Sequence, residues 1–191
     1  MRRTALAIFL AAALAGCGSS GATIPIESLH KLVLRSQDVG RPFELFAGGK
    51  QGHLDNQPPR NDPERYGREG GWIVRFQRPG STKTRGPLVV ESRADLFKDA
   101  GGAKTDLRAY RELFASPDLS QRRAIKVPQI GDEAIGQTFV QPATKPLRFY
   151  RIAWRYRNAT ASVTVEGFDG HVSAADAITL ARKQQRRLRL G

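Results

Sequence analysis

Hydrophobic and polar positions alternate along several stretches of the chain, and alternation with a period of two is typical of β-strands. In the first half this pattern predicts strands at 71–79 and 86–97, after a short strand at 42–46. In the second half it predicts strands at 132–141, 147–157 and 160–168. Most are separated by short polar segments, as expected of antiparallel neighbours.

Other stretches carry apolar residues at helical spacing. A helix is predicted over 103–115, with an apolar stripe of Leu107, Tyr110, Leu113 and Phe114. A last helix begins at Ser173, where Asp176 completes a pattern similar to a capping box, and runs to about Arg189. Its inward residues are Ile178, Ala181 and Leu188. Residues 24–40 predict a helix or a helical turn that ends at Gly40.

Strands followed by a helix occur twice in this order. The order predicts an α+β fold in which an antiparallel sheet has helices packed on one face. It also suggests an internal duplication, although the two halves share no motif. Residues 25–191 form a single predicted domain.

Residues 47–71 contain almost no apolar side chain and many Gly, Pro, Asn and Asp residues. Such a segment has little with which to pack a core, so it predicts a long loop, either flexible or functional.

The strands at 147–157 and 160–168 predict a hairpin. A two-residue turn at Asn158 and Ala159 places apolar residues opposite apolar residues and Arg151 opposite Glu166. The face away from the core then carries Arg151, Arg155 and Arg157. Guanidinium groups bind carboxylate and phosphate through charge-assisted hydrogen bonds, so this arginine face is a candidate site for an anionic ligand. The alternative is a solvated surface that binds nothing.

The first sixteen residues follow the order of an export signal, with Arg2 and Arg3 before an apolar run that ends in small residues. The run is too short for a membrane-spanning helix, which needs about 20 apolar residues. The sequence LAGC at 14–17 resembles the lipobox of bacterial lipoproteins. The resemblance implies that residues 1–16 are a signal peptide, that Cys17 carries the lipid and that 17–24 form a lipidated tether.

Composition adds two constraints. Cys17 is the only cysteine, so the rest of the chain has no disulfide and depends on its core for stability. Without residues 1–16 the chain has 29 basic and 18 acidic residues, a formal charge of +11. This charge favours anionic partners. An exported lipoprotein does not meet nucleic acid, so an anionic envelope component or a protein is the expected partner.

Candidate catalytic chemistry is absent from the sequence pattern. The three histidines, His30, His53 and His171, lack neighbouring ligands at metal-binding spacing, and no glycine-rich phosphate loop follows a strand. We therefore expect no metal, no cofactor and no catalytic residue.

The remainder of the chain resembles small envelope lipoproteins of actinobacteria and the extracellular sensor domains of some serine/threonine kinases. The shared stretches are LVLRSQDVG at 32–40, GDEA at 131–134, WRYRNATASVTV at 154–165 and, in the last helix, LARKQQRRL at 180–188. The sensor domains carry disulfides, which this chain cannot form outside Cys17, and that difference weighs against a sensor role.

These observations predict a lipid-anchored protein on the extracytoplasmic face of the cell membrane, with a non-enzymatic binding or interaction domain. The alternatives are a hydrolase of envelope polymers with an unrecognised site and a purely structural lipoprotein. The oligomeric state is left open.

Overall fold

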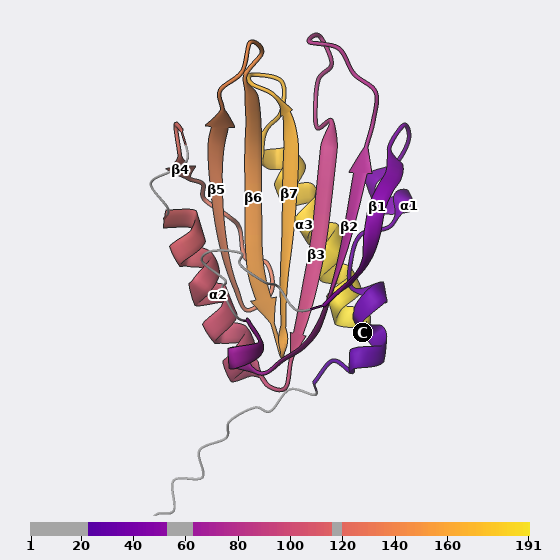
Figure 1. Ribbon diagram of the computed structural model, residues 1–191, viewed down its shortest axis with the longest axis vertical. Helices are drawn as coiled ribbons and strands as arrows, with labels where there is room; N and C mark the ends of the chain where they lie inside the picture. Colours follow the sequence, from indigo (N-terminus) through magenta and orange to yellow (C-terminus); the bar gives the residue numbers. More distant parts are fainter. Residues whose placement is uncertain (1–22, 53–62, 116–119) are drawn as a thin grey trace, which may run out of the picture.

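The computed structural model describes residues 23–52, 63–115 and 120–191 (Figure 1). Within these residues one sheet has the strand order β1-β2-β3-β7-β6-β5-β4, and all neighbouring strands are antiparallel. The strands are β1 (Glu44–Gln51), β2 (Arg68–Gln77), β3 (Val89–Phe97), β4 (Arg123–Ala124), β5 (Glu133–Gln141), β6 (Leu147–Tyr156) and β7 (Ala159–Phe168). The helices are α1 (Ser36–Val39), α2 (Ala100–Ala115) and α3 (Ala174–Leu190), with 3-10 turns η1 (Ile26–Lys31) and η2 (Pro63–Tyr66).

The predicted α+β fold with an antiparallel sheet is confirmed, but the helices lie on both faces of the sheet. Helix α3 lies behind the sheet in Figure 1 and packs on the face that carries Trp154 and Val163. Helix α2 packs on the opposite face, around Ala153. The small side chain of Ala153 leaves room for α2, and the hydroxyl of Thr160 donates to the buried carboxylate of Asp106 in α2 (2.5 Å). The two halves therefore share the order of strands followed by a helix, but their helices cover opposite faces.

The main core lies between the sheet and α3. Trp154, Ile152 and Val163 are fully buried there, and the burial of an aliphatic side chain such as Ile152 or Val163 stabilises the fold by about 1.5–3 kcal/mol. The Trp154 indole donates to Gln185 Oε1 in α3 (2.7 Å). The start of α3 has the predicted capping box, in which Ser173 and Asp176 bond each other's backbone amides.

The segment predicted as a helix or a helical turn over 24–40 forms two separate helical turns in place of one continuous helix. It forms η1 and α1, and between them Leu32, Val33 and Leu34 are all buried. One face of a continuous helix could not bury three consecutive residues, so the helix is interrupted between η1 and α1. The amide of Leu34 donates to Ser92 Oγ in β3 (3.0 Å).

The predicted loop over 47–71 is shorter in the structure at both ends. Strand β1 continues to Gln51 and β2 begins at Arg68, while residues 53–62 lie outside the described residues. Polar residues are tolerated here because β1 is an edge strand with mostly exposed side chains. Gly71 is required by packing, since a Cβ there would lie 2.1 Å from Arg68 Nη2 and 2.3 Å from Asp95 Oδ1.

The hairpin of β6 and β7 forms in a register shifted by two residues from the predicted one. The turn residues are Arg157 and Asn158, and Arg157 has a φ of +54°. Arg151 therefore lies opposite Thr164, not Glu166. A shift of two keeps every side chain on its predicted face, so matching the faces could not exclude it. Asn158 is 2% exposed and bonds Ile24 and Phe97, and these contacts accompany the observed register.

Candidate functional site

A row of polar side chains crosses the sheet next to α2. Helix α2 covers the positions of Ile135, Ala153 and Ser162, which are paired across β5, β6 and β7. The next side chains on this face form what we term the polar row. Its members, paired across β5, β6, β7, β3 and β2, are Gln137, Arg151, Thr164, Glu91 and Arg75.

Arg151 is the central cation of the polar row. Its guanidinium carbon lies 4.7 Å from the centre of the Phe139 ring, and Phe139 stacks on Phe149 with 4.8 Å between ring centres. Burial lowers the pKa of Arg151, while the negative charge of Glu91 opposes this effect. Glu91 is paired with Arg75 (2.7 Å). Among the described residues, Arg151 makes no hydrogen bond and no ion pair, so its charge is available to a ligand.

Gln137 is directly opposite Arg151 in the neighbouring strand β5. It is 1% exposed, and neither Oε1 nor Nε2 of its amide has a hydrogen-bond partner. A buried polar group without a partner costs about 1–3 kcal/mol. A group bound beside Gln137 would supply the missing hydrogen bonds, which makes Gln137 a candidate ligand contact.

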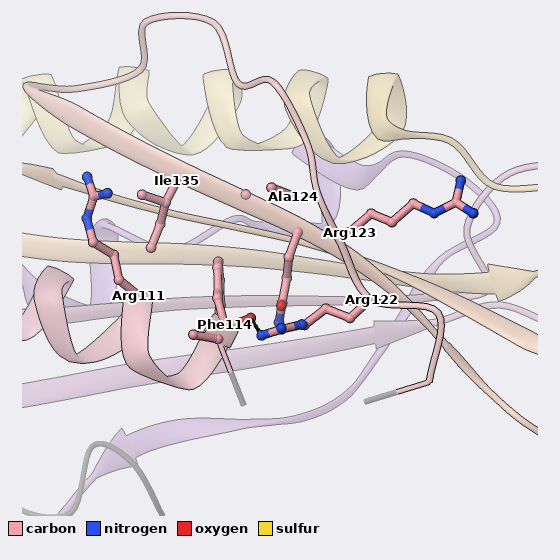
Figure 2. A pocket seen from close by; sticks show the side chains of 9 residues that line it. Arg111, Phe114, Arg122, Arg123, Ala124 and Ile135 are labelled. Carbon is pink, nitrogen blue, oxygen red and sulfur yellow. Dashed lines mark hydrogen bonds between the residues drawn. The ribbon is translucent and has the colours of Figure 1, made fainter. Parts of the chain in front are cut away.

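Gln137 also lines a pocket of about 350 Å³ between the end of α2 and strands β4 and β5 (Figure 2). We term it the α2–β5 pocket. Phe114, Ile135 and Ala124 supply apolar walls. Its other lining residues are Arg111, Ala115, Arg122, Arg123 and Gly136.

The three arginines of the α2–β5 pocket differ in their partners. Arg122 donates to the carbonyl of Phe114 in the last turn of α2 (2.6 Å), where helix carbonyls lack intrahelical partners. Arg111 pairs with Glu133. Arg123 is exposed and has no ion pair with any described residue, and Figure 2 shows its side chain pointing away from Phe114. The pocket therefore combines apolar walls with an excess of positive charge.

Arg155 and Arg157 lie apart from Arg151. Arg155 Nη1 is 2.9 Å from Asp132 Oδ2, and the backbone amide of Arg157 donates to the same oxygen (3.1 Å). The Arg157 guanidinium lies over the ring of Tyr156. Ala153, which α2 covers, separates this pair from Arg151. The structure thus divides the predicted arginine face into a part around Asp132, with Arg155 and Arg157, and a part at Arg151.

Glu166 is on the same face but does not neutralise Arg151. It lies opposite Phe149, two residues along β7 from Thr164, and no hydrogen bond or ion pair joins its carboxylate to the described part of the chain. Burial raises the pKa of Glu166. A carboxyl and a guanidinium thus remain unpaired on neighbouring strands.

The sequence reasoning missed Gln137 and the α2–β5 pocket. The only sign of Gln137 in the sequence is a polar residue between Ile135 and Phe139, which lie on the same face of β5 as Gln137.

Cys17 and the predicted signal peptide, residues 1–16, lie outside the described residues. The described ranges hold no cluster of three or more His, Cys, Asp or Glu side chains suited to a metal ion, and none of their helices is long and apolar enough to cross a membrane.

No protein-family model and no curated protein matches the sequence. Among solved structures, the fold is similar to the extracellular domain of PknH from Mycobacterium tuberculosis, with a TM-score of 0.66 and 13% identity. The match covers 89% of this chain and 99% of that domain. This similarity of fold agrees with the expected resemblance to the extracellular sensor domains of serine/threonine kinases.

Proposed function

We propose that this chain is an extracytoplasmic binding domain, anchored to a membrane by a lipid on Cys17, and that it is not an enzyme. The order of Arg2 and Arg3, an apolar run and LAGC supports export and lipid attachment. The similarity of the fold to the extracellular domain of PknH supports the location.

The ligand that we propose carries an anionic group, bound at Arg151. One observation carries this proposal: Arg151 and Gln137 are opposite each other across β5 and β6, and neither side chain has a hydrogen-bond partner among the described residues. Carboxylate or phosphate oxygens would accept from the Arg151 guanidinium and from the Gln137 amide. The apolar walls of the α2–β5 pocket favour a ligand in which an apolar portion adjoins the anionic group.

Calorimetric titration of the chain lacking residues 1–17 tests this site. Removing these residues leaves the core intact, since its buried apolar residues lie between Ile24 and Leu188. The probes are hexyl phosphate, hexanoate and hexanol, at 50 and 500 mM salt. The two anions should bind more weakly at high salt, and hexanol should bind least.

Two variants locate the site. Arg151→Gln should weaken anion binding at least tenfold, because a hydrogen bond to a charged group contributes about 1.5–3 kcal/mol. Arg155→Gln is the matched control, because Asp132 and Glu133 already neutralise Arg155. Equal losses in both variants would support the three-arginine face predicted from the sequence. Binding of neither anion to the unsubstituted chain would refute the proposal.

Cellular fractionation tests the anchor. The full chain should be found with the membranes and should gain the mass of a lipid at Cys17. Cys17→Ser should release it to the soluble fraction. A Cys17→Ser chain that stays with the membranes as before would contradict lipid attachment as the anchor.

A further inference from the structure

The described domain begins close to the proposed anchor. Ile24 is 2% exposed, its amide donates to Asn158 Oδ1 (2.7 Å) and its carbonyl accepts from Asn158 Nδ2 (3.1 Å). Only residues 18–23 separate Ile24 from Cys17. A fully extended chain spans at most about 3.6 Å per residue, so Ile24 lies within about 25 Å of the lipid-bearing residue. This inference rests on the proposed lipid at Cys17.

The last turn of α3 lies at the same end of the sheet. A Cβ at Gly191 would lie 2.7 Å from Leu32 Cδ2 and 3.4 Å from Ile24 Cγ2, so the end of α3 packs against the first buried residues. Figure 1 shows the mark C beside this end of α3, near the first described residues. The loops at 78–88 and 142–146 lie at the opposite end of the strands.

The surface around the end of α3 is basic. The exposed members of what we term the basic end surface are Lys31, Arg186 and Arg189, and Arg35 and Arg182 continue the positive charge toward the middle of α3. Arg187 lies beside Lys31, to whose carbonyl it donates (3.2 Å), and its pKa is lowered by burial and by the positive charge of Arg35, against the opposing effect of Asp38. The carboxylate of Asp38 in α1 pairs with Arg187 (3.3 Å). Glu27 in η1 is an exposed acidic residue near this surface.

We propose that the basic end surface binds the anionic headgroups of the membrane that holds Cys17. The short connection places this surface within reach of the headgroups, and its charge is opposite to theirs. The lipid and the basic surface then act as two membrane signals, which together hold a protein more firmly than either alone. The strands stand upright on the membrane, with the loops at 78–88 and 142–146 farthest from it.

Vesicle sedimentation of the chain lacking residues 1–17 tests the surface without the lipid. Vesicles of phosphatidylglycerol and phosphatidylcholine are compared with phosphatidylcholine alone, at 50 mM salt. The chain should sediment with the anionic vesicles only. The triple variant Lys31→Glu, Arg186→Glu, Arg189→Glu should bind at least about a hundredfold more weakly, since each basic residue near an anionic surface strengthens binding about fivefold and each new glutamate repels the surface.

A second triple variant separates this surface from the net charge of the chain. Lys83→Glu, Arg85→Glu, Lys145→Glu reverses three exposed charges at the far end of the strands and should bind as the unsubstituted chain does. Equal losses in the two variants, or no binding of the unsubstituted chain to anionic vesicles, would overturn the proposal. Failure of the Cys17→Ser fractionation would instead concern the anchor alone, because the sedimented chain carries no lipid.

Discussion

Arg151 and Glu166 lie on the same face of adjacent strands but two residues out of register, so no ion pair joins them. Burial disfavours the charge on each side chain, lowering the pKa of Arg151 and raising that of Glu166. An arginine whose charge is desolvated and not neutralised contributes little to stability. This relationship is the basis for assigning Arg151 to ligand binding.

The stability of the ligand-free domain should therefore change little in Arg151→Gln. The substitution removes a desolvated charge, which stabilises, and the contact with the Phe139 ring, which destabilises by about 0.5–2 kcal/mol. We expect the free energy of unfolding in urea to change by less than about 1 kcal/mol. A loss of 3 kcal/mol or more would show that Arg151 is structural.

Asp95 lies on the same face of the sheet as Arg151, but its charge is paired and we expect it to stabilise the fold. It is 1% exposed and lies 2.8 Å from Arg68 Nε and 2.7 Å from Arg93 Nε. Asp95→Asn should lower the free energy of unfolding by about 3–5 kcal/mol, because it removes the fully buried charge that Arg68 and Arg93 share and leaves Arg68 only its pair with the less buried Glu64. Urea denaturation measures this change. In the matched control, Glu91→Gln removes the more exposed pair with Arg75 and should cost less than about 1 kcal/mol.

Asn158 joins the start of the domain to the β6–β7 turn. Asn158→Ala leaves the amide and carbonyl of Ile24 and the carbonyl of Phe97 without this partner. We expect a loss of about 2–5 kcal/mol in unfolding free energy. Gln141→Ala, an exposed position on β5, should change it by less than about 0.5 kcal/mol. Similar small effects of both substitutions would contradict the role of Asn158.

Glu166 makes the stability depend on pH. Because its pKa is raised in the folded domain, the folded state holds the proton more tightly than the unfolded chain does. Its contribution to stability is therefore complete below the unfolded pKa of about 4.3 and is lost as the pH rises through the folded pKa. Glu166→Gln should melt at a higher temperature than the unsubstituted chain at pH 8, and the two should converge near pH 4. A constant difference at all pH values would exclude this explanation.

The sequence predicted much of the fold, because the apolar pattern of β2, β3, β5, β6 and β7 and of α2 and α3 is local. It could not predict the hairpin register, since registers that differ by two bury the same faces. Asn158, which joins the turn to the start of the domain, bonds Ile24, which is 134 residues away. The side of the sheet covered by α2 likewise depends on distant contacts, such as that of Asp106 with Thr160.

The candidate site was predictable only in part. Arg151 could be placed on the outer face by alternation, but the ion pairs of Arg155 with Asp132 and Glu133 depend on how β5 pairs with β6. The burial of Gln137 results from the tertiary packing around β5, where the end of α2 and Arg122 line the same pocket. These groups meet only in the folded domain.

The most direct measurement is an NMR titration of the chain lacking residues 1–17 with hexyl phosphate, observing side-chain N–H signals. The signals of the Gln137 amide and of Arg151 Nε–H should shift together and saturate, while that of Arg155 Nε–H stays in place. Unchanged Gln137 and Arg151 signals, while other arginine signals move, would contradict the assignment of the ligand site.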